Sequence, residues 1–110
     1  MKNKFLHFDS LKNMNLVPAK KFSDKIAEAF NIKNYKFKNM KSPLQNNDKD
    51  CGVYLMAIMD EIASTRKISD NLRNKITPDY IKKFRIALMT CITQSKANYN
   101  WETYYKMLVE

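Results

Sequence analysis

The chain has 110 residues, a formal net charge of +9 at pH 7, and hydrophobic residues at 45% of its positions. This length and composition suit one domain or part of one, and they argue against a disordered chain. No apolar run reaches roughly 18 residues, the length of a membrane-spanning helix. The N-terminal residues lack the apolar core and small-residue cleavage site of a secretory signal. The sequence therefore predicts neither a membrane partner nor secretion.

The positive charge is scattered along the chain and forms no dense basic run. Two interpretations remain open, a solvated lysine-rich surface and a basic face that attracts an acidic protein or nucleic acid. Zinc-finger and RNA-recognition patterns are absent from the sequence, so we do not expect a nucleic-acid partner. The two cysteines lack the spacing of a disulfide framework or a metal site. They indicate an intracellular setting, the cytoplasm or nucleus. We expect the protein to use no metal and no other cofactor.

The first third of the chain predicts a strand followed by a helix. Residues 4–8 form a short apolar run that ends at Asp9, which is typical of a buried strand. A helix is expected over 18–30, with Pro18 in its first turn. Its apolar residues recur at helical spacing and predict one buried stripe, consisting of Phe22, Ile26, Ala29 and Phe30.

A second strand and a central helix come next. Aromatic and lysine residues alternate within 34–41, which indicates a half-exposed strand that Pro43 ends. The loop 43–50 follows. Residues 51–64 are apolar on almost every side until Asp60, so we predict a central helix that is buried all round.

The last third predicts further helices. Residues 66–76 form a connector with room for one helical turn, and Thr77-Pro78 is a good helix start. The buried stripe predicted for this helix consists of Ile81, Phe84, Leu88, Met89 and Ile92. A final amphipathic segment is expected over 101–109. The order indicates an α+β fold. Because a two-stranded sheet is marginal alone, we expect part of a larger domain, with an open sheet edge through which the chain can associate.

Cys51 stands at the predicted start of the central helix, between Asp50 as N-cap and Gly52, the only glycine in the chain. Free backbone N–H groups and the helix dipole favour a thiolate there, so we expect the pKa of Cys51 to lie below about 8.5, the value of a free thiol. Glycine costs a helix up to about 1 kcal/mol, but it lets a substrate backbone approach the sulfur. The alternative is a small core cysteine, which is our interpretation of Cys91.

Two stretches together resemble a known family. They are HFDSL at 7–11 and PLQNNDKDCGVY at 43–54. They are similar to the papain-like cysteine proteases specific for ubiquitin-like modifiers, the SUMO- (sentrin-) and NEDD8-specific enzymes, whose pattern is an aromatic-Asp-Ser strand end and later P-x-Q-x-N-x-x-D-C-G-V/M-Y. The match runs over 5–64, and TPDYIKKFR at 77–85 resembles the following helix of the NEDD8-specific branch more loosely.

The resemblance implies a fold and a partner. The fold is a partial papain-like cysteine protease fold, with short strands packed on a central buried helix and further helices after it. Residues 1–110 correspond to the C-terminal half of the catalytic domain. The implied partner is a ubiquitin-like modifier, SUMO or NEDD8, together with its conjugates.

The resemblance also implies three site residues. Cys51 would be the nucleophile that attacks the carbonyl after a Gly-Gly tail, and Asp9 would orient the catalytic histidine. Gln45 would donate to the oxyanion together with the backbone N–H of Cys51. The residues themselves agree on Gln45, because a neutral amide beside a nucleophile suits a developing negative charge. The alternative is an ordinary loop glutamine.

The catalytic histidine is where the sequence departs from the family pattern. In the family it belongs to a His-Trp pair on the strand before the aspartate strand, and this sequence begins after that point. The only histidine of the chain is His7. It shares a strand face with Asp9 but matches a position that the family commonly fills with an aromatic residue. His7 is thus interpreted as structural, with a substitute base as the alternative.

Three functional hypotheses follow. The first is half of a thiol protease domain that cleaves after the Gly-Gly of a modifier. The second is a catalytically inactive relative that still binds a ubiquitin-like protein, and the third is a basic nucleic-acid binder. The last leaves the arrangement of Asp9, Gln45 and Cys51 unexplained.

Overall fold

The computed structural model describes residues 3–69 and 71–93. They form a mixed α and β fold, in agreement with the predicted fold class. The predicted segment at 101–109 lies outside the described residues. Every helix within the two described ranges is too short or too polar to cross a membrane. The elements in chain order are β1 (Lys4–His7), α1 (Leu16–Ala29), β2 (Lys36–Asn39), α2 (Cys51–Thr65), α3 (Leu72–Lys75) and α4 (Pro78–Thr93).

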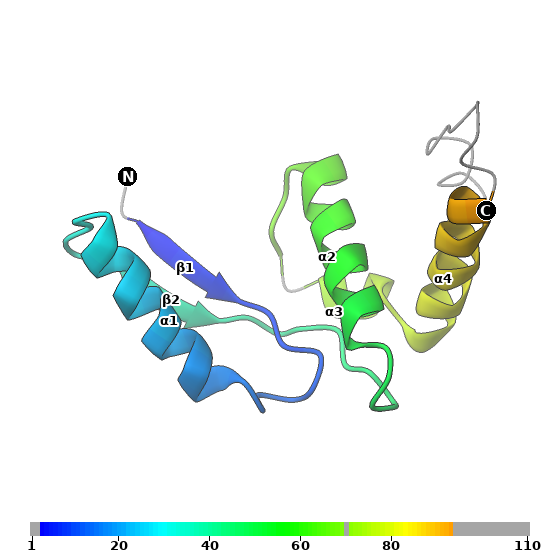
Figure 1. Ribbon diagram of the computed structural model, residues 1–110, viewed down its shortest axis with the longest axis horizontal. Helices are drawn as coiled ribbons and strands as arrows, with labels where there is room; N and C mark the ends of the chain where they lie inside the picture. The colour runs from blue at the N-terminus through cyan, green and yellow to red at the C-terminus, as the bar shows by residue number, and fades with distance from the viewer. Residues whose placement is uncertain (1–2, 70, 94–110) are drawn as a thin grey trace.

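The elements β1, α1 and β2 make a parallel pair of strands joined by a helix, which we call the sheet unit (Figure 1). Lys4 lies opposite Lys36, and the pairing continues to the end of both strands. Parallel strands need a long crossover, and α1 supplies it while packing against both strands. Phe5 and Tyr35 meet edge to face, with ring centroids 5.1 Å apart.

The buried face of α1 differs from the predicted stripe. Ser23 and Ala27 are buried, whereas Phe22 and Phe30 are exposed. Small side chains therefore face the short two-stranded sheet. Phe22 in α1 and Phe30, the C-cap residue that follows it, remain largely open to solvent. Helical spacing alone could not show which side the sheet would take, because apolar residues occur on more than one side of this helix.

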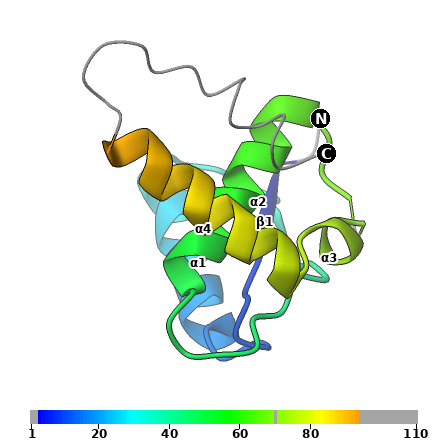
Figure 2. The same cartoon turned by 90° about the vertical axis from the view of Figure 1, so that its right-hand side faces the viewer.

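The helices α2, α3 and α4 form the helical unit, and α4 lies across α2 (Figure 2). Thr77 caps α4 as predicted, because its hydroxyl accepts the N–H of Tyr80 at 3.2 Å. The predicted helical turn in the connector is α3. The main core cluster lies in this unit and comprises Tyr54, Ala57, Ile58, Leu72, Ile76, Ile81, Phe84 and Ala87.

The prediction that the central helix is buried all round is wrong for α2. Tyr54, Ala57 and Ile58 are buried, but Leu55 is 59% and Met59 is 60% exposed. One face of α2 therefore packs within the helical unit while another remains open, even though both are apolar. Among the described residues, nothing closes over this second face.

The buried stripe of α4 agrees with the prediction in its first part and differs from it in its last part. Ile81 and Phe84 are buried, but Ala87 and Cys91 take the places expected for Met89 and Ile92, which are exposed. The structural interpretation of Cys91 as a small core residue is thus confirmed.

Candidate functional site

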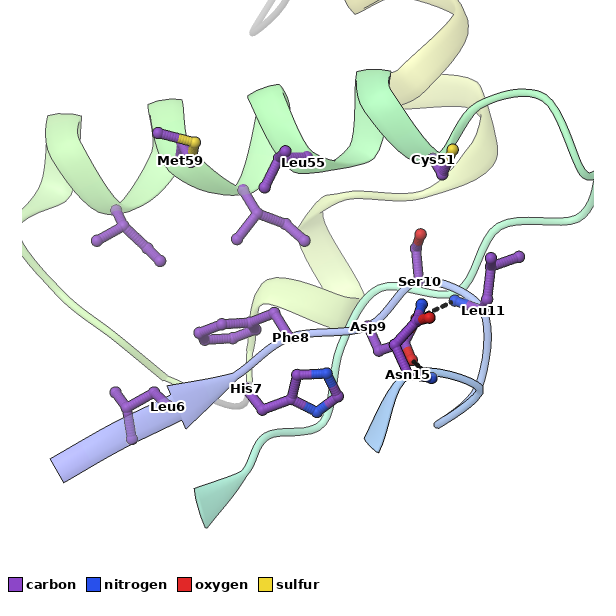
Figure 3. Close-up of a pocket in the computed structure, with 12 residues that line it drawn as sticks. Leu6, His7, Phe8, Asp9, Ser10, Leu11, Asn15, Cys51, Leu55 and Met59 are labelled. Carbon is purple, nitrogen blue, oxygen red and sulfur yellow. Dashed lines mark hydrogen bonds between the residues drawn. The ribbon is translucent and has the colours of Figure 1, made fainter. Parts of the chain in front are cut away.

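A pocket of about 410 Å³ lies between α2 and the segment that comprises the end of β1 and the residues after it (Figure 3). At one end its lining includes the polar residues Cys51, Asp9 and Ser10. Its remaining wall is mainly apolar, and its lining includes Leu6, Phe8, Leu11, Leu55, Ile58, Met59 and Ile62. Two of the three predicted site residues, from distant parts of the sequence, therefore face the same pocket.

Cys51 is the first residue of α2, as predicted, and its side chain is exposed. Asp50 occupies the N-cap position, but the predicted side-chain cap is not formed. Its carboxylate instead pairs with Arg85 of α4 and accepts a hydrogen bond from the amide of Asn47 at 2.6 Å. The carboxylate of Asp50 thus points towards α4, and the N-cap residue makes no side-chain hydrogen bond to the first turn of α2.

Asn47 shapes the loop that precedes Cys51, a role that the sequence did not suggest to us. Its side-chain oxygen accepts the backbone N–H groups of Lys49 at 2.9 Å and Asp50 at 3.0 Å. This is the local bonding by which asparagine stabilises a turn. The sequence did contain a signal for this role, because Asn47 is the asparagine of the P-x-Q-x-N-x-x-D-C-G pattern. The position of Cys51 therefore depends on a turn closed by side-chain hydrogen bonds.

Asp9 is only 6% exposed, and both carboxylate oxygens are bonded. They accept the backbone N–H groups of Leu11 at 2.9 Å and Asn15 at 2.7 Å. Burial alone would raise the pKa of Asp9, but the N–H groups of Asn15 and Leu11, with the nearby His7, outweigh burial and lower the pKa from 3.8. Asp9 is therefore a fixed anion at neutral pH, which is the state that orients an imidazole in a catalytic triad.

His7 is held by the sheet. Its Nδ1 lies 3.0 Å from the side-chain oxygen of Asn39, and its ring stacks on Phe37 with centroids 5.9 Å apart. No hydrogen bond joins His7 to Asp9 or Cys51 within residues 3–69 and 71–93. These contacts favour the structural interpretation of His7 over the substitute base.

Gln45 does not line the pocket, but it is hydrogen-bonded to Ser10, which does. Its side-chain oxygen accepts the hydroxyl of Ser10 at 2.5 Å, and Ser10 is a lining residue. Its side-chain nitrogen donates to the backbone carbonyl of Asn47 at 2.5 Å. The loop that carries Gln45 thus runs beside the loop that carries Asp9.

Gly52 has open space in front of it. A Cβ built on this residue would meet nothing within 4 Å, and Gly52 is absent from the positive-φ residues. Neither packing nor backbone conformation within the described chain therefore requires a glycine here. The free space lies beside Cys51, where an extended backbone could approach the sulfur.

The polar end of the pocket combines an exposed cysteine, a carboxylate held by hydrogen bonds, and free space beside Gly52. This combination suits nucleophilic chemistry on a carbonyl once a base joins it. In the part of the chain that the structure describes, no group of three or more His, Cys, Asp or Glu side chains could hold a metal ion.

Comparison with known proteins identifies a family and relatives of this chain. The family model described as "Ulp1 protease family, C-terminal catalytic domain" matches residues 1–96. Sentrin-specific protease 8 of Homo sapiens is 34% identical over 88 residues, which cover 76% of this chain and 42% of that protein. Probable sentrin-specific protease 8 of Dictyostelium discoideum is 28% identical over 125 residues, covering 86% and 51%.

The chain thus spans roughly half the length, or less, of the curated relatives that it matches. The family match nevertheless covers most of the chain and includes both loops that meet at the pocket. From its sequence match and from the placement of Cys51 and Asp9, the chain belongs to the Ulp1 protease family.

Proposed function

We propose that this chain carries the nucleophile and the acid of a cysteine peptidase that cleaves after the C-terminal Gly-Gly of a ubiquitin-like modifier, SUMO or NEDD8. The observation that carries the proposal is the meeting of Cys51 and Asp9 at one pocket. The sentrin-specific proteases among its relatives support this class of substrate.

In the proposed reaction, the sulfur of Cys51 attacks the carbonyl carbon of the last glycine. The carbonyl oxygen becomes an oxyanion, which the backbone N–H of Cys51 and the amide of Gln45 stabilise. The open space at Gly52 admits the two glycines of the tail, because a side chain there would stand beside the sulfur. Asp9 holds an imidazole in the orientation needed to take the thiol proton and return it to the leaving amine.

The imidazole of His7 is engaged by Asn39 and Phe37, so the proposed reaction needs an imidazole from a further segment. We propose that a segment bearing the His-Trp pair enters the pocket and lays apolar side chains against the open face of α2. The exposed Leu55 and Met59 support this placement, as does the carboxylate of Asp9 at the polar end. The complete assembly would have the papain-like arrangement, and we place it in the cytoplasm or nucleus.

The test is release of a fluorophore from the C-terminus of NEDD8 or SUMO, with ubiquitin as a third substrate. We expect negligible turnover by residues 1–110 alone, because the leaving amine needs a proton donor and Asp9 is ionised. Turnover should appear when a segment with the His-Trp pair is co-expressed, and Cys51→Ala should abolish it. No turnover in the completed assembly would reject the proposal.

His7→Ala is the matched control for the base. Turnover that persists in this variant leaves the imidazole of the added segment as the base. If the isolated chain instead turns over substrate and His7→Ala stops it, His7 is the base, and the completion by a second segment is wrong.

The second candidate function is a catalytically inactive relative that binds a ubiquitin-like protein. It is favoured by one observation, the engagement of the only histidine with Asn39 and Phe37. This hypothesis predicts that the chain captures SUMO or NEDD8 with equal affinity before and after Cys51→Ala, and that adding the His-Trp segment produces no cleavage.

A further inference from the structure

The carboxamide of Gln45 is held at both ends in this structure. Its oxygen accepts the hydroxyl of Ser10, and its nitrogen donates to the carbonyl of Asn47, each at 2.5 Å. The backbone N–H of Gln45 also donates to the backbone carbonyl of Ser10 at 3.0 Å. Ser10 therefore contacts Gln45 through its side chain and its main chain.

These contacts fix which way the amide faces. A backbone carbonyl can only accept hydrogen bonds, so the end of Gln45 that faces Asn47 must be the NH₂ group. The hydroxyl of Ser10 then donates to the oxygen at the other end. An NH₂ group has two hydrogens, and the carbonyl of Asn47 takes one of them. One hydrogen remains for an oxyanion.

The structure assigns to Ser10 the role of a positioning residue, which holds the amide of Gln45 so that its NH₂ group serves as the oxyanion donor. This inference deepens the proposed peptidase function and rests on it. Ser10 acts through Gln45, because its own hydroxyl hydrogen is used in the bond to the amide oxygen.

The position of Ser10 links two parts of the site. Asp9 is its chain neighbour, and the carboxylate of Asp9 fixes the same turn by accepting the N–H groups of Leu11 and Asn15. The turn that places the acid therefore also places the residue that holds the oxyanion donor. A displacement of this turn would disturb both functions together.

The first test measures the hold on Gln45 directly, by NMR of its side-chain NH₂ group in the 110-residue chain. The pair of signals is identified by its loss in Gln45→Ala. Ser10→Ala should shift this pair and speed its hydrogen exchange by roughly two- to tenfold, the worth of one hydrogen bond. Ser10→Thr, which keeps a hydroxyl, should restore the wild-type behaviour.

Ser64→Ala is the matched control, because the hydroxyl of Ser64 bonds within α2 to the carbonyl of Asp60. It should leave the Gln45 signals unchanged. An unchanged Gln45 pair in a folded Ser10→Ala chain would overturn the assignment.

The second test uses NEDD8 and SUMO that end in a glycine aldehyde. The sulfur of Cys51 adds to the aldehyde carbon, the electron pair of the C=O bond moves to oxygen, and the thiol proton ends there. No amine leaves, so the reaction needs no proton donor for a leaving group. Gln45→Ala should weaken this adduct by roughly 100-fold and Ser10→Ala by roughly two- to tenfold.

The double variant decides whether Ser10 acts through Gln45. Ser10→Ala combined with Gln45→Ala should be no weaker than Gln45→Ala alone, because a positioning residue has no effect once its target is removed. Effects that multiply would overturn the assignment. If the chain completed by the His-Trp segment forms no adduct on Cys51 with either aldehyde, the proposed function fails, while the NMR signals of the 110-residue chain still decide independently whether Ser10 holds Gln45.

Discussion

The sheet unit and the helical unit differ in how they hold their site residues. The helical unit contains the main cluster of buried apolar side chains and presents Cys51 from the end of a packed helix. In and around the sheet unit the buried side chains are few, and several are small or polar, among them Asp9, Ser23 and Ala27. Cys51 is thus placed by a helix that apolar packing holds, together with the turn closed by Asn47, whereas Asp9 is placed mainly by hydrogen bonds to backbone groups.

Hydrogen bonds in the loop before α2 connect the two units. The hydroxyl of Ser42 accepts the N–H of Asp9 at 2.7 Å, while the backbone carbonyl of Ser42 accepts the side chain of Arg73 at 3.0 Å. Tyr54 of α2 donates its hydroxyl to the carbonyl of Leu44 at 3.2 Å. The geometry of the candidate site, which residues of both units form, therefore depends on this loop. Substitutions in the sheet unit and in the helical unit should have different effects on stability.

The largest expected effect is the loss of a core side chain in the helical unit. Phe84 is 1% exposed, and Phe84→Ala should lower the free energy of unfolding by about 3–5 kcal/mol. Phe22 in α1 is 65% exposed, so Phe22→Ala should change it by less than about 0.5 kcal/mol. Urea denaturation of both variants measures the difference. Equal losses would contradict the contrast between the units.

Removing the acid should have the next largest effect. Asp9→Ala leaves the N–H groups of Leu11 and Asn15 without their acceptor, which should cost about 2 kcal/mol of unfolding free energy. Asp48→Ala, which removes an exposed carboxylate from the neighbouring loop, is the control.

The effect of Asp9 should depend on pH. Because the folded pKa lies below 3.8, the stabilisation by the carboxylate is present above that value and is lost as the pH falls through the folded pKa. The difference in stability between wild type and Asp9→Ala should therefore shrink below pH 3.8. A difference that stays constant down to strongly acidic pH would show that the charge of Asp9 does not stabilise its turn.

The two cysteines allow a smaller test of the same contrast within the helical unit. Cys51 is exposed at the pocket, and Cys91 is 4% exposed in the core. Iodoacetamide at neutral pH should modify Cys51 at least about tenfold faster, because alkylation requires an accessible sulfur. Mass spectrometry of the modified chain identifies the site. Equal rates, or faster modification of Cys91, would oppose the assignment of Cys51 as nucleophile.

The smallest expected change in stability comes from Gly52. Gly52→Ala should raise the free energy of unfolding by up to about 1 kcal/mol, because a Cβ would meet open space and alanine favours a helix. The same substitution should weaken the adduct with a modifier aldehyde, since the Cβ would stand beside the approaching tail. A stabilised variant with undiminished adduct formation would remove the proposed reason for the glycine.

Patterns that depend on neighbouring residues in the sequence were predicted well. The start of α2 at Cys51 and the Thr77 cap of α4 agree with the structure, because helix ends are set by local backbone and side-chain chemistry. The side chain of Asp50 is the exception. Its carboxylate forms an ion pair with Arg85 of α4, a partner that no local pattern identifies.

Predictions of which apolar side chains are buried were less successful. Phe22 and Leu55 have the residue type and spacing of core positions, yet both are exposed. Hydrophobicity along a helix indicates that some face should be buried, but the neighbouring elements decide which face it is. Likewise, the sequence indicated Asp9, Gln45 and Cys51 as site residues, and only the structure showed that Gln45 stands behind the pocket lining.

The sequence by itself determined the family and indicated Asp9, Gln45 and Cys51 as candidate site residues, because spaced motifs are local properties of the chain. The tertiary structure alone decided that Asp9 and Cys51 share one pocket, and that Ser10 and Asn47 hold the amide of Gln45. Except for the bond between Gln45 and Asn47, which lie in one loop, these contacts join distant parts of the chain. Their geometry depends on how the sheet unit and the helical unit pack, and no short stretch of sequence contains that information.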